Sequence, residues 1–167
     1  SSPATTDLYN IDDESPRLQK ADSDHFHSMV ARIAYLARMC RLECVGAIAF
    51  LSTRVTKSTE QDMQKLHHLI RYLHQSHGSG HRGFRITPGD GPIQAVVYCD
   101  ASYGINHDGK SQSGVVVGIG GRGFIDQYSG KQSITAKSSS EAELLCTSNE
   151  TNRGIRTKNF LQGQGYP

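Results

Sequence analysis

The sequence has no long hydrophobic run and few cysteines. Its apolar stretches fall well short of the roughly 18 residues that a transmembrane helix needs. The first ten residues, up to Asn10, lack the basic and apolar blocks of a signal peptide. We therefore expect an intracellular protein that is not secreted and contacts no membrane. The four cysteines lie within regular patterns and are expected to be free, buried thiols: Cys40, Cys44, Cys99 and Cys146.

Net charge is also small, at +2, but it is unevenly distributed. Residues 1–22 carry five acidic and two basic side chains, a balance of −3. The remaining residues carry 16 basic and 11 acidic side chains, a balance of +5. This excess is compatible with a polyanionic partner without requiring one.

The first half of the chain has the period of helices. Residues 1–22 are polar and acidic and predict an extended acidic linker. Apolar residues at steps of three and four predict three helices over residues 23–77. Ser58 and Gln61 have the spacing of a capping box for the third helix, and Gly78 is expected to end it. Residues 78–92 are rich in Gly and Pro and predict a linker between two domains.

The second half changes to a strand period, so the fold class is α/β (α+β). Three strands and one helix are expected. The first strand is apolar at successive positions, which predicts burial on both of its faces. Ser138 with Glu141, or Ser140 with Glu143, is expected to cap the helix, which becomes doubtful near Gly154. The expected strands are Ile93–Asp100, Ser113–Ile119 and Phe124–Tyr128.

The glycines of Gly118–Gly123 fit the pattern G-x-G-x-x-G after a Val-rich strand. A dinucleotide site would need a helix directly afterwards, because the pyrophosphate lies on the helix N-terminus. The segment that follows, Phe124–Gly130, has no helical period. A hairpin turn is therefore the favoured interpretation.

Histidines and two cysteines suggest a metal site, but no two pairs have zinc-ligand spacing. His67, Arg71 and His74 instead share one polar helix face. That face is either solvated or in contact with nucleic-acid phosphates. The residues considered as zinc ligands are His67, His68, His74, His77, His81, Cys40 and Cys44.

Two carboxylates have more informative positions. Asp100 ends the first predicted strand, and Glu143 is expected in the first turn of the later helix. If they meet, they can hold Mg²⁺ through oxygen ligands. Taken separately, Asp100 is equally well explained as a turn former and Glu143 as a helix cap.

At these residues the sequence resembles the ribonuclease H domain of copia-type retrotransposon Pol polyproteins. Four motifs match in order and spacing: Tyr98–Ser102, Asp108–Gly114, Ser129–Gln132 and Lys137–Leu144. Upstream segments resemble the end of the reverse transcriptase region, as a thumb-like or connection-like helical segment: Phe26–Val30, Thr53–Glu60 and Leu69–Leu73. The resemblance covers nearly the whole chain.

The resemblance implies a ribonuclease H-like mixed sheet of five strands in the order 3-2-1-4-5, of which residues 93–167 would supply the first three antiparallel strands and the first helix. It implies hydrolysis of the RNA strand of an RNA–DNA hybrid with two Mg²⁺ (or Mn²⁺) ions. Asp100 and Glu143 are the implied catalytic and metal-binding residues, and Glu141 is a nearby decoy. The remainder of the Pol polyprotein is an implied partner, and a cytoplasmic particle or the nucleus is the implied location.

The family's third carboxylate, in a D-N motif on the fourth strand, has no counterpart, since no Asp follows Asp126. We expect a truncated ribonuclease H-like domain, inactive alone. The alternative is a non-catalytic or decayed remnant that binds nucleic acid. An unpaired strand Ile93–Asp100 is expected to favour self-association. Basic residues near the sheet are expected to contact phosphates unless they are merely solvated: Lys110, Arg122, Lys131 and Lys137.

Overall fold

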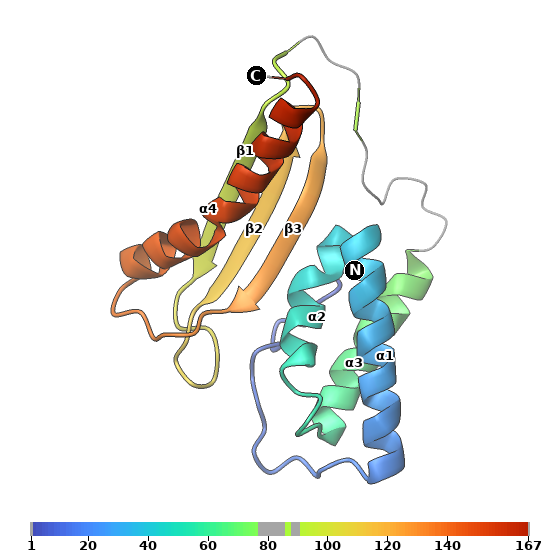
Figure 1. Cartoon of the computed structure of the whole chain (residues 1–167). Helices are drawn as coiled ribbons and strands as arrows, with labels where there is room; N and C mark the ends of the chain where they lie inside the picture. The colour runs from blue at the N-terminus through green and yellow to red at the C-terminus, as the bar shows by residue number, and fades with distance from the viewer. Residues whose placement is uncertain (1, 77–85, 88–90, 167) are drawn as a thin grey trace. The chain divides into compact units, whose positions relative to one another are not determined.

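A computed structural model describes residues 2–76, 86–87 and 91–166 of the chain (Figure 1). The chain divides into two compact units, Ser1–Gly83 (unit 1) and Phe84–Pro167 (unit 2). Each unit is described by itself below. The linker predicted over 78–92 falls largely outside the described residues, as does the predicted helix end at Gly78.

Unit 1 consists of three α-helices. They are α1 (Lys20–Met39), α2 (Val45–Ser52), which follows a short 3-10 turn at Leu42–Cys44, and α3 (Glu60–Gln75). Each helix turns an apolar stripe toward a shared core. On α1 the buried residues are Phe26, Val30, Ile33 and Ala37, at the helical spacing seen in the sequence.

The cap of α3 lies one residue beyond the predicted position. Thr59 is the N-cap, and Asp62 forms a reciprocal capping box with it. Ser58 instead shares a 3.0 Å hydrogen bond with the Ser23 hydroxyl on α1. Asp62 displaces Gln61 from this role because its carboxylate also faces the buried side chain of Arg54.

Residues 2–19 are irregular, but they are packed onto unit 1 rather than forming a free linker. Leu8 is buried, and the Tyr9 ring contacts the Phe50 ring edge-on at 5.4 Å between centroids. The Lys65 ammonium on α3 donates a hydrogen bond to the Asn10 carbonyl. The acidic composition concealed these apolar anchors, and α1 begins at Lys20, inside the segment predicted as linker.

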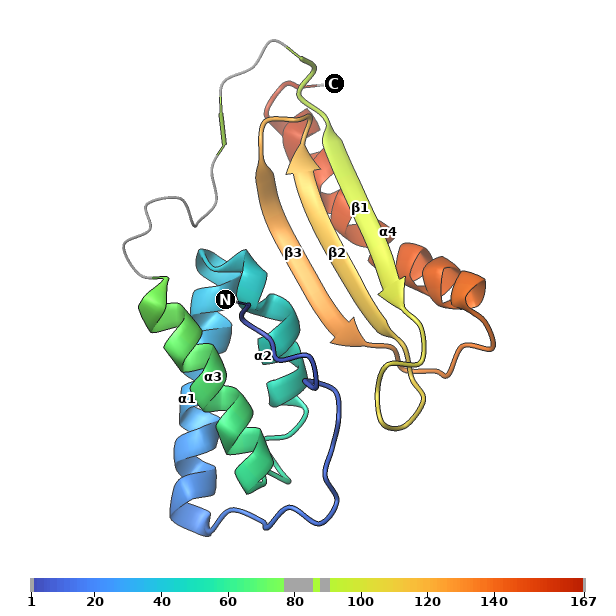
Figure 2. The ribbon, with the colours of Figure 1, turned by 180° about the vertical axis from the view of Figure 1, so that it is seen from behind.

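Unit 2 is an antiparallel sheet with one helix on one face. Its strands are β1 (Ala95–Ser102), β2 (Gln112–Ile119) and β3 (Phe124–Lys131), paired in the order β1-β2-β3. The long helix α4 (Ser139–Gly163) lies across the sheet, as both views show (Figures 1 and 2). Within the Gly118–Gly123 segment, β2 ends at Ile119 and Gly120–Gly123 form the turn into the antiparallel strand β3, which confirms the hairpin interpretation.

The prediction that the first strand is buried on both faces is wrong. The core of unit 2 lies beneath α4, where Val115 and Val117 of β2 meet Ala142 and Cys146 of α4. On β1, Tyr98 is 57% exposed. The cause is architectural: within unit 2, α4 covers one face of the sheet, so alternate apolar residues of β1 face outward.

The structure shows a mixed fold of helices and a three-stranded antiparallel sheet, as the sequence predicted. All four cysteines are thiols. Among the described residues, every helix is too short or too polar to cross a membrane.

Candidate metal site

Asp100 lies near the C-terminal end of β1, and its side chain is exposed. Its neighbours Cys99 and Ala101 belong to the core beneath α4. Because side chains alternate along a strand, Asp100 lies on the open face of the sheet together with Tyr98. An exposed carboxylate at a strand end is accessible to a ligand from solvent.

The start of α4 is fixed by local caps. The Ser138 hydroxyl accepts a hydrogen bond from the Glu141 N–H at 3.1 Å, which confirms one of the two predicted caps. The Glu141 carboxylate in turn accepts from the Lys137 N–H at 2.6 Å. Glu141 is therefore used in capping, while Glu143 begins the second turn of α4 rather than lying in the first.

Glu143 reaches the end of β1. Its Oε1 atom accepts a hydrogen bond from the Ala101 N–H at 3.2 Å. One turn further along α4, the Cys146 thiol donates to the Asp100 carbonyl at 3.3 Å. The structure thus brings the Glu143 carboxylate to the backbone beside Asp100, across 42 positions of sequence.

The two carboxylates approach this point from different sides. Glu143 comes from the α4 side and bonds the β1 backbone, whereas Asp100 projects from the open face. Carboxylate oxygens are the ligands that Mg²⁺ prefers, and Mg²⁺ commonly keeps several waters beside one or two protein carboxylates. Both side chains therefore offer donor atoms of the type that Mg²⁺ prefers. Within the described part of the chain, no group of three or more His, Cys, Asp or Glu is arranged to hold a metal.

Cys99, next to Asp100, is not set up as a nucleophile. Burial raises the pKa of the Cys99 thiol above its ordinary value, and the neighbouring Cys146 adds to the effect. A reactive cysteine needs a lowered pKa, because the thiolate is the attacking form. Covalent thiol chemistry at this site is therefore disfavoured.

Three of the four predicted basic residues lie at the Asp100 end of the sheet. Lys131 ends β3 and forms a 2.8 Å ion pair with Asp108 in the β1–β2 loop. The hydrogen bond from Lys131 lowers the pKa of Asp108. Lys110, in the same loop, donates to the Ser133 carbonyl at 2.7 Å. Lys137, exposed just before α4, also lies at this end.

Arg122 lies at the other end of the sheet. It belongs to the β2–β3 turn, roughly 25 Å from the Asp100 end at about 3.3 Å per strand residue. Its guanidinium donates to the Gly91 carbonyl at 2.7 Å, and its own carbonyl accepts from the Thr87 N–H at 2.7 Å. The Arg122 side chain therefore holds the segment that leads into β1. It does not lie with Lys110, Lys131 and Lys137.

Two of the residues considered for a zinc site are engaged elsewhere. Cys44 is buried in the core of unit 1, and the His68 ring bonds the Ser2 carbonyl at 3.0 Å. His77 and His81 lie outside the described residues.

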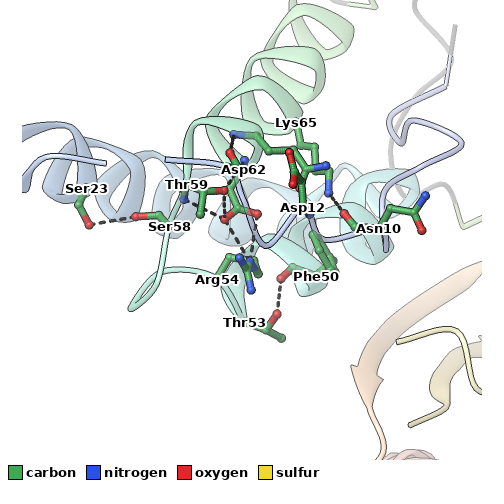
Figure 3. Close-up of polar contacts among 12 residues, drawn as sticks. Asn10, Asp12, Ser23, Phe50, Thr53, Arg54, Ser58, Thr59, Asp62 and Lys65 are labelled. Carbon is green, nitrogen blue, oxygen red and sulfur yellow. Dashed lines mark hydrogen bonds and ion pairs between the residues drawn. The ribbon is translucent and has the colours of Figure 1, made fainter. Parts of the chain in front are cut away.

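Unit 1 contains a buried ionic cluster that the sequence patterns did not indicate. The Arg54 Nε–H donates to both oxygens of Asp62, at 3.0 and 3.1 Å (Figure 3). Asp62 also accepts from the Thr59 N–H and hydroxyl, so its carboxylate is fully used. The T-x-x-D spacing from Thr59 was the available signal. Because the Asp62 oxygens already accept hydrogen bonds from protein groups, we assign this cluster a role in stabilising unit 1 and not in binding a ligand.

At the Asp100 end of the sheet, unit 2 thus presents Asp100 and Glu143 together with Lys110, Lys131 and Lys137. Neither a protein-family model, nor a curated protein, nor a solved structure matched the chain. A function for this site has to be proposed from its chemistry and from the sequence motifs.

Proposed function

We propose that this chain is part of a copia-type retrotransposon Pol polyprotein. Unit 1 would be the end of the reverse transcriptase region, and unit 2 would belong to a ribonuclease H-like domain that acts on RNA–DNA hybrids. The observation that carries the proposal is the contact of Glu143 with Ala101. It joins two motifs of the resemblance at one sheet end, beside Asp100.

In this proposal Asp100 and Glu143 bind Mg²⁺ or Mn²⁺. The ions, when bound, lower the pKa of a coordinated water and stabilise charge on the oxygen that leaves phosphorus. The chain's own contribution is to present Asp100 from the end of β1 and Glu143 from α4 at the same end of the sheet. Since two carboxylates do not fix two ions in octahedral geometry, we expect the 167-residue chain to bind one ion weakly.

The lysines support a nucleic-acid partner. Lys110, Lys131 and Lys137 would contact phosphates near the carboxylates, giving weak binding that does not depend on sequence and falls steeply with salt. Arg122 is too far along the sheet to share that contact. The rest of the polyprotein would supply further partners.

Metal binding tests the proposal directly. Calorimetric titration of the full chain with Mg²⁺ should give weak binding that Asp100→Asn and Glu143→Gln abolish. Glu141→Gln is the matched control, because Glu141 lies on the same helix but is occupied in capping, and it should bind as the parent chain does. Equal Mg²⁺ binding by Asp100→Asn would refute the site.

A second function has one observation in its favour. The lack of a metal-binding group of three or more ligands among the described residues favours a non-catalytic role in binding nucleic acid. Incubation of the chain with an RNA–DNA hybrid and Mg²⁺ or Mn²⁺ tests whether this chain has a complete catalytic site. We expect binding without cleavage; cleavage that Asp100→Asn abolishes would show that this chain has a complete site.

A further inference from the structure

Gln132 is buried where three elements of unit 2 meet. It directly follows β3 and is only 6% exposed. Its side-chain nitrogen donates to the Ser113 hydroxyl on β2 at 3.1 Å and to the Ala142 carbonyl on α4 at 2.9 Å. The amide orientation follows from these partners, because a backbone carbonyl can only accept. Gln132 therefore bridges the sheet and the helix.

The two partners of Gln132 flank the Glu143 contact. Ala142 is the residue before Glu143, and Ser113 pairs across the sheet with Ala101. The Ala101 N–H is the group that donates to Glu143. The Gln132 side-chain nitrogen thus holds both sides of the Glu143–Ala101 hydrogen bond. It fixes the turn of α4 that carries Glu143, and it fixes β2 beside Ala101.

We propose that Gln132 is a positioning residue that holds the Glu143 carboxylate on the Ala101 N–H, beside Asp100. Its relevance to metal binding rests on the proposed function, but the contact it controls is a property of the fold. The effect of Gln132 is transmitted through the first turns of α4, because a helix moves as a rigid element once its start is fixed.

The effect of Gln132 on the position of Glu143 can be measured separately from its effect on the folding stability of unit 2. The Gln132 Oε1 atom is buried and has no partner among the described protein groups. Burying such an acceptor is unfavourable, so an apolar isostere regains part of what the two lost hydrogen bonds contributed. Gln132→Met should therefore fold with nearly parental stability while releasing the start of α4.

The test is the amide proton shift of Ala101 in nuclear magnetic resonance spectra of the metal-free full chain. Glu143→Ala defines the shift without the carboxylate. Gln132→Met should move the Ala101 signal most of the way to that value, and Ser113→Ala, which removes one of the two bonds, should move it less. Leu145→Ala is the control, because it weakens packing against the same core without touching the bridge.

If the Ala101 amide proton shift is the same in Gln132→Met as in the control Leu145→Ala, Gln132 does not position Glu143. Should Gln132→Met fail to fold, Ser113→Ala alone decides, and an unchanged Ala101 shift in that variant overturns the inference. No metal is present, so loss of the proposed function leaves this outcome unaffected. A chain that binds no Mg²⁺ yet shows the predicted shifts would refute the nuclease assignment alone.

Discussion

The Arg54–Asp62 pair is the most deeply buried charge pair described in unit 1. The Asp62 side chain is fully buried and that of Arg54 is 6% exposed. Asp62→Ala leaves a buried guanidinium without its carboxylate and removes half of the α3 capping box. We expect a loss of about 3–5 kcal/mol in the free energy of unfolding.

Urea denaturation followed by circular dichroism measures this loss. Glu43→Ala is the control, because the Arg41–Glu43 pair lies nearer the surface and should contribute below about 1 kcal/mol. Equal losses in the two variants would contradict the structural role given to Asp62.

Lys65 predicts a pH dependence of stability. Burial lowers the pKa of Lys65, and the carboxylates of Asp62 and Asp7 oppose the shift only partly. Between the lowered folded pKa and the ordinary value of 10.5, the unfolded chain binds more protons. The free energy of unfolding should therefore rise as pH increases through this window.

Comparison of the parent chain with Lys65→Met isolates the Lys65 contribution. The difference in their unfolding free energies should grow in favour of the parent chain between neutral pH and pH values approaching 10.5. A difference that stays constant with pH would mean that Lys65 is not desolvated.

Among the elements, α4 shows why a glycine inside a helix does not always weaken it. At Gly154, an added Cβ atom would lie 2.5 Å from Cγ2 of Val97 on β1. Alanine normally stabilises a helix interior by about 0.5–1 kcal/mol relative to glycine. Here the β-branched side chain of Val97 cannot easily move, so Gly154→Ala should destabilise unit 2 by about 1–3 kcal/mol.

Two comparisons check the Gly154 prediction by denaturant unfolding. Gly46→Ala, in α2, has open space at its Cβ position and should be neutral or stabilising. Adding Val97→Ala to Gly154→Ala should recover part of the loss. A stabilising Gly154→Ala would show that α4 does not approach β1 this closely.

The elements themselves were largely predictable from the sequence. The period of Phe26, Val30 and Ile33 identified α1. A run of successive apolar residues identified the first strand, and two segments joined by a Gly-rich turn identified the other two. The sequence left the helix doubtful near Gly154, yet α4 continues through it to Gly163, because helix propensity is local whereas the glycine is explained by its close approach to Val97 on β1. The same limit applies to the candidate site. Asp100, Glu143 and Gln132 all stand in matched motifs, but the bridge that Gln132 makes between Ser113 and Ala142 depends on side-chain packing that the motif does not show.

At the scale of the whole molecule, the exposed edge of β1 predicts self-association. In the described sheet β1 is an edge strand with an exposed Tyr98 at its centre and no Lys or Pro to discourage pairing. The weight-average mass from sedimentation should rise with concentration, and Tyr98→Lys should suppress the rise. Tyr35→Lys, at a 71% exposed position on α1, is the control and should not suppress it. Suppression by both variants equally would point to nonspecific association.

The central claim is that Asp100 and Glu143 form a cation site at the end of β1. Paramagnetic Mn²⁺ tests it by broadening the amide signals of nearby residues. At low Mn²⁺ concentration, we expect broadening of Asp100, Ala101, Gly114 and Glu143 before other signals, and its loss in Asp100→Asn. Broadening that instead centres on the acidic N-terminal segment, or that persists in Asp100→Asn, would contradict the account.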